Sequence, residues 1–335
     1  MNNPLDALLE AFATLQRQGT PAPLTGLSAF NALPFPGRPQ DKVAIDQEGA
    51  PVILIHTDDE GLGSPPTELT YLSVRHRVQC DIIDPQGHRE RHAFSTIRFR
   101  GDDPGLLTYF LRVVGSSVLA LPDGPAEREI SRMMARLAEL FNALSQQPKQ
   151  SAQGLWGEVF MISQARDPAS VVRAWRLTPE DTFDFTEGDN HVEVKSVVGT
   201  VRHHHFSLGQ LRPADGSDVI ICSLLLRTSE NATSLGDLIT LVRDRLGTDQ
   251  EARLIFDRNV ALTLGNSIAA ALRVRFDAAF AITHCRFLRA STIPSVPPQL
   301  PSEITDVRFT VDITTLPHLP PNEEGSPLFE AARPR

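Results

Sequence analysis

Two carboxylates and one lysine lie close together in the sequence, on either side of a predicted turn. Asp184 precedes the turn, and Glu193 and Lys195 follow it. Because strand side chains alternate between two faces, Glu193 and Lys195 share one face, and a hairpin would bring Asp184 across from them. Carboxylate oxygens suit Mg²⁺, and an ammonium can orient or help deprotonate an attacking water. The pattern predicts metal-assisted hydrolysis, with Lys195 stabilising charge that builds on phosphorus.

Further groups extend this acidic set. The main-chain carbonyl of Val194 is a candidate third metal ligand beside Asp184 and Glu193. Glu158 lies upstream in an otherwise apolar helical segment, flanked by Gly154 and Gly157, which permit close approach of helix and strand. Three carboxylates and one lysine sum to a charge of −2, which one Mg²⁺ would neutralise. Without a metal, one of the carboxyl groups is expected to hold a proton.

Lysine is rare in this chain, which draws attention to Lys195. Of 32 basic residues only three are lysine, and the others are Lys42 and Lys149. Those two stand in loop-like segments and have no acidic residue two positions before them. A lysine ammonium is a compact charge that can hydrogen-bond water beside a metal, where a guanidinium is a poor substitute. Lys195 is therefore the first residue to mutate.

The elements that would position these residues follow one another in the second half of the chain. The turn at 187–190 predicts a hairpin between 182–185 and 192–198, with Val192, Val194 and Val198 pointing into a core. The apolar run at 219–226 is typical of a buried central strand. Patterning also predicts helices over 154–165 and 235–246, a short helix capped by Ser207, a strand over 172–177, and a strand over 201–206 that extends the hairpin.

The first half of the chain reads as helices mixed with β-hairpins. Apolar spacing predicts helices over 5–16, 106–121 and 127–146, and β-like runs occupy 51–56, 72–83 and 92–99, with a loop over 19–40. A polar segment at 145–153 is the best junction between lobes. We expect an α+β protein with an α/β core, divided into a β-rich and helical lobe (1–147), a second lobe carrying the chemistry (148–316) and a loose tail (317–335).

At this point the sequence resembles a known superfamily. A helix glutamate followed by D-x8-E-x-K across a hairpin is similar to the PD-(D/E)xK signature of restriction endonucleases and DNA-repair nucleases. More narrowly, GLWGE, FDF, VEVKS and HHHFSLGQL, within 154–211, resemble bacterial PD-(D/E)xK motif proteins of restriction and phage-defence gene clusters. Phe183 stands where the signature usually has proline. The resemblance implies a restriction-endonuclease-like mixed sheet and an active-site set of Glu158, Asp184, Glu193 and Lys195, with Gln210 as an auxiliary polar residue.

The resemblance also implies what the protein acts on and with. It implies a Mg²⁺- or Mn²⁺-dependent DNA endonuclease, or nuclease subunit, in which Asp184, Glu193, Val194 and Glu158 hold the metal. Partner proteins would be a helicase-like ATPase or a methyltransferase of a defence system, and a homodimer would allow cutting of both strands. The alternative is a DNA-binding or assembly subunit that keeps the nuclease fold without cutting.

Composition restricts the remaining options. The net charge of −9 argues against binding to nucleic acid by bulk charge alone. Three scattered cysteines and no CxxC pair give no support to a structural zinc site, and no P-loop sequence is present. The longest apolar run is less than half a membrane span, and the N-terminal segment lacks a basic leader, which predicts a cytoplasmic protein without contact to a membrane.

Two basic segments remain open to more than one interpretation. In a strand, His203 and His205 share a face opposite His204, so the three make a poor zinc site and favour either contact with DNA phosphate or a polar strand end. The hairpin over 71–100 is rich in arginine. It could follow a phosphate backbone, or it could simply be a solvated face.

Overall fold

The computed structural model describes residues 4–21, 28–57, 65–148, 150–176, 178, 181–212, 216–297, 301, 304, 307–320 and 323–335. The chain divides into two compact units, Met1–Gln146 (unit 1) and Gln147–Arg335 (unit 2). Among the described residues, no helix has both the length and the apolar character that crossing a bilayer requires. The protein mixes helices with mixed sheets, so the expected α+β class is confirmed.

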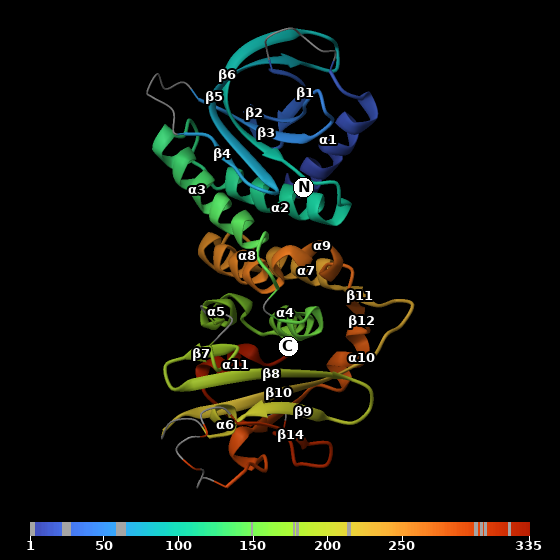
Figure 1. Ribbon diagram of the computed structural model, residues 1–335, viewed down its shortest axis with the longest axis vertical. Helices are drawn as coiled ribbons and strands as arrows, with labels where there is room; N and C mark the ends of the chain where they lie inside the picture. Colours follow the sequence, from blue (N-terminus) through green and yellow to red (C-terminus); the bar gives the residue numbers. More distant parts are fainter. Residues whose placement is uncertain are drawn as a thin grey trace. The chain divides into compact units, whose positions relative to one another are not determined.

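Unit 1 is built on a six-stranded sheet whose order is β1-β2-β3-β6-β5-β4 (Figure 1). A further, parallel pairing between β1 and β5 joins Ser28–Asn31 to Cys80–Ile83 and closes the sheet on itself. Its apolar interior includes Phe30, Leu54 and Phe94. The elements of this unit are α1 (Pro4–Gln18), β1 (Ser28–Phe35), β2 (Arg38–Ile45), β3 (Pro51–His56), β4 (Thr67–Glu68), β5 (Leu72–Ile83), β6 (Arg89–Phe99), α2 (Pro104–Leu119) and α3 (Glu127–Ala143).

The expected helices and hairpin of unit 1 are confirmed, but the expected loop over 19–40 is largely wrong. β5 and β6 pair across a turn closed by Asp84, and α3 buries its apolar stripe. Ser28–Phe35 and Arg38–Ile45 form a hairpin, and Gly37 supplies the positive φ of +84° that its turn requires. Residues 22–27 of the expected loop lie outside the described residues. Lys42 is in β2 rather than a loop, and Lys149 also lies outside the described residues.

Unit 2 is layered around a mixed four-stranded sheet of order β13-β10-β8-β7. Helices α4 and α5 lie against one face, with α7 and α8 outside them, and β9, β14 and α6 lie on the other side (Figure 1). The helices are α4 (Ala152–Gln164), α5 (Pro168–Ala174), α6 (Leu208–Leu211), α7 (Leu235–Leu246), α8 (Gln250–Leu264), α9 (Ile268–Ala271), α10 (Ala278–Thr283) and α11 (Pro327–Ala332), with 3₁₀ turns η1 (Gly265–Ser267) and η2 (Ala290–Thr292). The strands are β7 (Phe185–Glu187), β8 (Asn190–Val198), β9 (His203–Ser207), β10 (Asp218–Leu226), β11 (Thr233–Ser234), β12 (Arg275–Phe276), β13 (Arg286–Arg289) and β14 (Arg308–Asp312).

The hairpin that the sequence predicts is present, and β8 is an inner strand of the sheet. β7 pairs antiparallel with β8, with Phe185 opposite Val192, across a turn in which Gly188 has φ +58°. β10 runs parallel to β8 along its length, so β8 has a paired strand on each side at Asn190–Val192. Val192 and Val194 are buried as expected, but Val198 is 51% exposed because β8 ends there.

Two predictions for unit 2 are wrong, and one helix was missed. The strand expected over 172–177 is mainly helix α5, which Asp167 caps and Pro168 begins; Trp175 makes only an isolated bridge to Phe185, and Leu177 lies outside the described residues. The strand near 201–206 pairs with β14 instead of extending the β7–β8 sheet. Helix α8 was not anticipated, and its buried face includes the polar residues Asp257 and Asn259.

The tail beyond Pro317 is not loose where it is described. Leu328, Phe329 and Ala332 of α11 are buried, and α11 contacts α5, β8 and α4. Ala165 bridges Pro334, and the main-chain N–H of Arg166 donates to the carbonyl of Arg333 at 2.9 Å. A short apolar helix can therefore complete a core even when prolines and acids surround it.

Candidate active site

The hairpin brings Asp184 and Glu193 into direct contact. Asp184 stands one residue before β7, where its Oδ2 accepts the main-chain N–H of Val194 at 2.9 Å, as a strand carbonyl would. The main-chain N–H of Asp184 in turn donates to Oε2 of Glu193 at 3.2 Å. Both residues are buried. Register and side-chain bonds together therefore hold two carboxylates at one end of the hairpin.

Lys195 of β8 and Gln210 of α6 both contact the carboxylate of Glu193. The Nζ of Lys195 lies 2.7 Å from Oε1 of Glu193 and 3.1 Å from Oε1 of Gln210. Nε2 of Gln210 donates to Oε1 of Glu193 at 2.7 Å. Ser207 fixes the position of Gln210 through a capping box at the start of α6. The Lys195 side chain is 18% exposed, so this is where the cluster meets solvent.

Glu158 reaches the cluster from α4 through an arginine. Nη1 of Arg176 donates to Oε2 of Glu158 at 2.5 Å and to Oδ1 of Asp184 at 2.7 Å. Nε1 of Trp175 also donates to Oε2 of Glu158, at 2.8 Å. Helix α4 packs closely on β8, since a Cβ placed on Gly157 would lie 3.2 Å from the Cβ of Ser196. Gly154 has no such neighbour on the strand, so of the two glycines only Gly157 serves the close approach expected from the sequence.

Negative charge exceeds positive charge in this cluster. Burial, followed by the charge of Asp184, raises the pKa of Glu158 and of Glu193, and burial also raises the pKa of Asp184. Burial lowers the pKa of Arg176, but the charges of Glu158 and Asp184 outweigh it, so the net shift is upward. With every group ionised, three carboxylates face one guanidinium and one ammonium, which sums to −1 rather than the −2 expected without Arg176.

The donor set fits a hard divalent cation held by two carboxylates. Asp184 and Glu193 offer oxygen ligands side by side, and Mg²⁺ is usually bound through one or two carboxylates and several waters. Within the described residues, however, no three His, Cys, Asp or Glu side chains form a metal-holding group. Arg176 bonds both Glu158 and Asp184, and so stands where a third ligand was expected to meet the metal.

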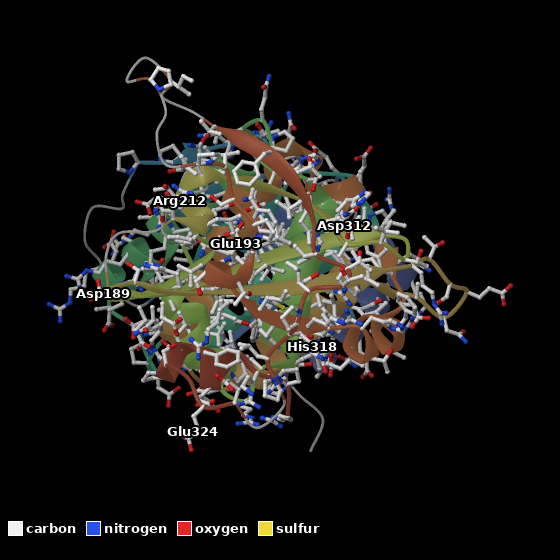
Figure 2. All side chains as sticks on the ribbon, turned by 90° about the horizontal axis from the view of Figure 1, so that it is seen from below. Asp189, Glu193, Arg212, Asp312, His318 and Glu324 are labelled. Atoms are coloured by element: carbon white, nitrogen blue, oxygen red, sulfur yellow. The ribbon has the colours of Figure 1, made fainter. Side chains whose placement is uncertain are left out.

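The predicted residues thus fall into two groups. Asp184, Glu193, Lys195 and Gln210 form one hydrogen-bonded cluster, and Glu158 joins it only through Arg176. For Val194 it is the N–H group that contacts Asp184. Seen from below in Figure 2, Glu193 lies toward the middle of the view, whereas Asp189, at the turn, lies at its edge.

Arg176 and Trp175 were missed by sequence reasoning. The available signal was Arg176, one of two arginines in the otherwise apolar run VVRAWRL, next to a tryptophan whose N–H needs a partner when buried. Both side chains are almost inaccessible to solvent. A buried guanidinium needs hydrogen-bond acceptors, but the sequence does not show which acceptors Arg176 meets.

The two basic segments contribute less positive charge than their sequences suggest. The face prediction for the histidines is confirmed, since His204 is buried and its neighbours are exposed, but His203 lies 3.4 Å from Asp312. On the β5–β6 hairpin most arginines already face acids of unit 1, namely Arg75 and Arg100 with Glu68, Arg77 with Glu127, Arg91 with Asp81, and Arg98 with Asp46 and Glu48. This pairing favours a solvated, internally neutralised face.

Comparison with known protein families places the chain beside one of them. A family model described as "Putative PD-(D/E)XK family member (DUF4420)" matches residues 11–314, which covers most of both units. No curated protein and no solved structure matches.

Proposed function

The chain belongs to the PD-(D/E)XK family that this model describes, and from that premise we propose that it is a Mg²⁺- or Mn²⁺-dependent DNA endonuclease, or the nuclease subunit of a bacterial restriction or phage-defence system. The observation that carries the proposal is the bonded set of Asp184, Glu193 and Lys195 at the end of the β7–β8 hairpin. Family membership supports a nuclease-like fold, and these three residues support metal-assisted hydrolysis as its reaction.

The proposed reaction adds water across a phosphodiester P–O bond. A bound divalent cation would polarise the phosphate and lower the pKa of a coordinated water. Asp184 and Glu193 would hold that cation through their carboxylate oxygens, with the Val194 carbonyl as a further candidate ligand. The Lys195 ammonium, 2.7 Å from Glu193 and partly open to solvent, would orient the attacking water and stabilise negative charge on the phosphate oxygens.

Gln210 and Glu158 would act on this set from either side. Gln210 bonds Glu193 and Lys195 at once, so it would fix both side chains relative to each other. Glu158 would anchor Arg176, which in turn bonds Asp184. A displacement of a catalytic group by about 1 Å can lower the rate about a hundredfold. We therefore expect substitution of Gln210 or Glu158 to lower nuclease activity.

Nicking of supercoiled plasmid DNA in Mg²⁺ or Mn²⁺ tests the proposal. We expect Asp184→Asn to abolish nicking, and Lys195→Met to slow it by roughly 10²–10⁴-fold, the usual range for a lost proton-transfer or charge-stabilising group. Lys42→Met, the same substitution in unit 1, is the matched control and should nick like the wild type. Equal nicking by the wild type, Asp184→Asn and Lys195→Met would remove the assignment.

The alternative is a DNA-binding or assembly subunit that keeps the fold without cutting. The salt bridge of Arg176 with Glu158 and Asp184 favours it, because a buried cation offsets part of the negative charge without any metal. A wild-type protein that retards DNA in a gel but leaves plasmids intact at every Mg²⁺ and Mn²⁺ concentration would support this alternative. Cleavage that appears only on addition of a helicase-like ATPase or methyltransferase encoded nearby would instead support a partner-dependent nuclease.

A further inference from the structure

Arg176 is fixed in place by several elements of unit 2. Its Nη1 bonds Glu158 and Asp184, and its Nη2 donates to Oε1 of Gln150 at 2.9 Å and to Oγ1 of Thr263 on α8 at 3.3 Å. The main chain is held too, because its N–H donates to the Asp184 carbonyl at 2.8 Å and its carbonyl accepts from Asn259 at 3.0 Å.

These contacts make Arg176 a permanent part of the site. Its side chain is 2% exposed, and a guanidinium stays protonated at any pH at which the protein folds. Withdrawing it would leave Glu158 and Asp184 as buried neighbours without a counter-charge, which is costly in a protein interior. The residue therefore does not serve as a gate that swings away when a metal arrives.

The position of Arg176 restricts where a metal ion can bind. Its guanidinium already occupies the space that links Glu158 with Asp184, and a divalent cation placed there would meet a fixed positive charge at contact distance. Glu158 also approaches from the α4 side of the sheet, whereas the Glu193 side chain meets Gln210 of α6 on the other side. The carboxylate pair left for a cation is Asp184 with Glu193.

We propose that Arg176 acts as an internal cation that limits the site to one divalent ion, held by Asp184 and Glu193, and that Glu158 is a positioning residue rather than a metal ligand. The inference rests on the proposed function for the presence of the metal and deepens it by setting the number of ions. It replaces the expectation that Glu158 joins the first coordination sphere. It also agrees with the lack of a three-ligand group among the described residues.

Mn²⁺ binding to the full chain, followed by electron paramagnetic resonance and calorimetry, tests this proposal without reference to cleavage. We expect one Mn²⁺ per wild-type chain. Glu158→Gln, which keeps an oxygen for Arg176 and Trp175, should retain that stoichiometry with affinity weakened by about 10–100-fold, as for groups that act behind the ligands. The isosteric Asp184→Asn and Glu193→Gln variants should lose saturable binding.

The outcomes separate this proposal from the proposed function. Two Mn²⁺ ions per wild-type chain, or loss of binding in Glu158→Gln as complete as in Asp184→Asn, would overturn the one-ion site even if plasmids are nicked. If the wild type binds one ion, Glu158→Gln still binds it and no plasmid is nicked, the one-ion site is supported and the proposed endonuclease activity is wrong. A wild type that binds no Mn²⁺ would overturn the one-ion site whatever the nicking assay gives.

Arg176 itself supplies a second readout. Arg176→Met removes the internal cation, so a folded variant should take up a second Mn²⁺, whereas Arg176→Lys should keep one. A folded Arg176→Met that still binds a single ion would count against the proposal. If that variant does not fold, the comparison of Glu158→Gln with Asp184→Asn decides the question.

Discussion

His204 is a buried histidine beside the site that is held in its neutral form. Its Nε2 lies 2.7 Å from Oγ of Ser223, and the residue is 3% exposed. Burial, followed by the positive charges of Lys195 and Arg202, lowers its pKa to about 3. Protonation of His204 would place a third positive charge next to these two groups.

This histidine should make stability depend on pH. Its folded pKa lies below its unfolded value, so the unfolded chain binds a proton first, and the stabilisation present above about pH 6.5 is lost as the pH falls toward 3. We expect the free energy of unfolding of the wild type, relative to His204→Gln, to fall by at most about 1.4 kcal/mol per pH unit below pH 6.5. Urea unfolding over that range measures it.

The exposed neighbour provides the control. His205→Gln should change the pH dependence much less than His204→Gln, because His205 lies on the opposite, solvent-facing side of β9. A His204→Gln variant whose stability follows the wild type in parallel at every pH would show that the buried imidazole is not the titrating group.

Site residues were predictable from the sequence where they lie close together along the chain. Asp184, Glu193 and Lys195 lie within one hairpin, so alternation and one turn suffice to bring them together. Arg176 was not predictable in this way, because its acceptors on Gln150, Glu158, Asp184 and Thr263 are 8 to 87 residues away. Only tertiary packing decides which carboxylate an isolated arginine meets.

Among the elements, the contact of α4 with β8 sets the distance between Glu158 and the hairpin. Gly157 faces Ser196 and Leu224 closely, whereas Gly154 has only its own cap residue Ser151 nearby. We expect Gly157→Val to force helix and strand apart and to lower the free energy of unfolding by about 1–3 kcal/mol, the usual cost of overpacking. Gly154→Ala should change it by less than about 1 kcal/mol.

Thermal or urea unfolding of the two glycine variants checks this expectation. The pair is informative because both glycines lie within one turn of the same helix, so a general intolerance of α4 to side chains would affect both. Equal stabilities for Gly157→Val and Gly154→Ala would mean that the helix does not rest on the strand at Gly157.

Elements were predictable where a cap or turn residue marks their limits. The β7–β8 turn has Gly188 at positive φ, and α7 starts at the capping residue Ser234. The strand expected over 172–177 is wrong because Asp167 caps a helix there and Pro168 begins it, and these are stronger local signals than β-branched Val172. No local signal could pair β9 with β14, because their contacts span some 105 residues.

At the scale of the whole molecule, the division at Gln146 and Gln147 predicts that unit 2 folds alone. We expect a fragment of residues 147–335 to unfold cooperatively and to bind Mn²⁺ like the full chain. A fragment of residues 147–320 lacks α11, whose Phe329 is buried and packs edge-on against Phe287 with ring centroids 5.4 Å apart. Loss of one such aromatic side chain alone costs about 3–5 kcal/mol.

Circular dichroism and thermal unfolding of both fragments measure this. Equal stability of the two fragments would show that α11 is dispensable, and a disordered 147–335 fragment would show that unit 2 depends on unit 1. The division itself was suggested by the polar segment around Pro148, whereas the role of α11 was hidden by the prolines and acids that precede it.

Because β9 pairs with β14, the surroundings of the candidate site are complete only after β14 has been synthesised. His205 meets Thr310 only 105 residues later, and the N–H of Leu208, at the start of the helix that carries Gln210, donates to the carbonyl of Val307 at 2.9 Å. At translation rates of about 5–20 residues per second, several seconds separate synthesis of Lys195 from synthesis of the strand that covers its surroundings. A nascent chain therefore carries Asp184, Glu193 and Lys195 before it contains the strand that pairs with β9.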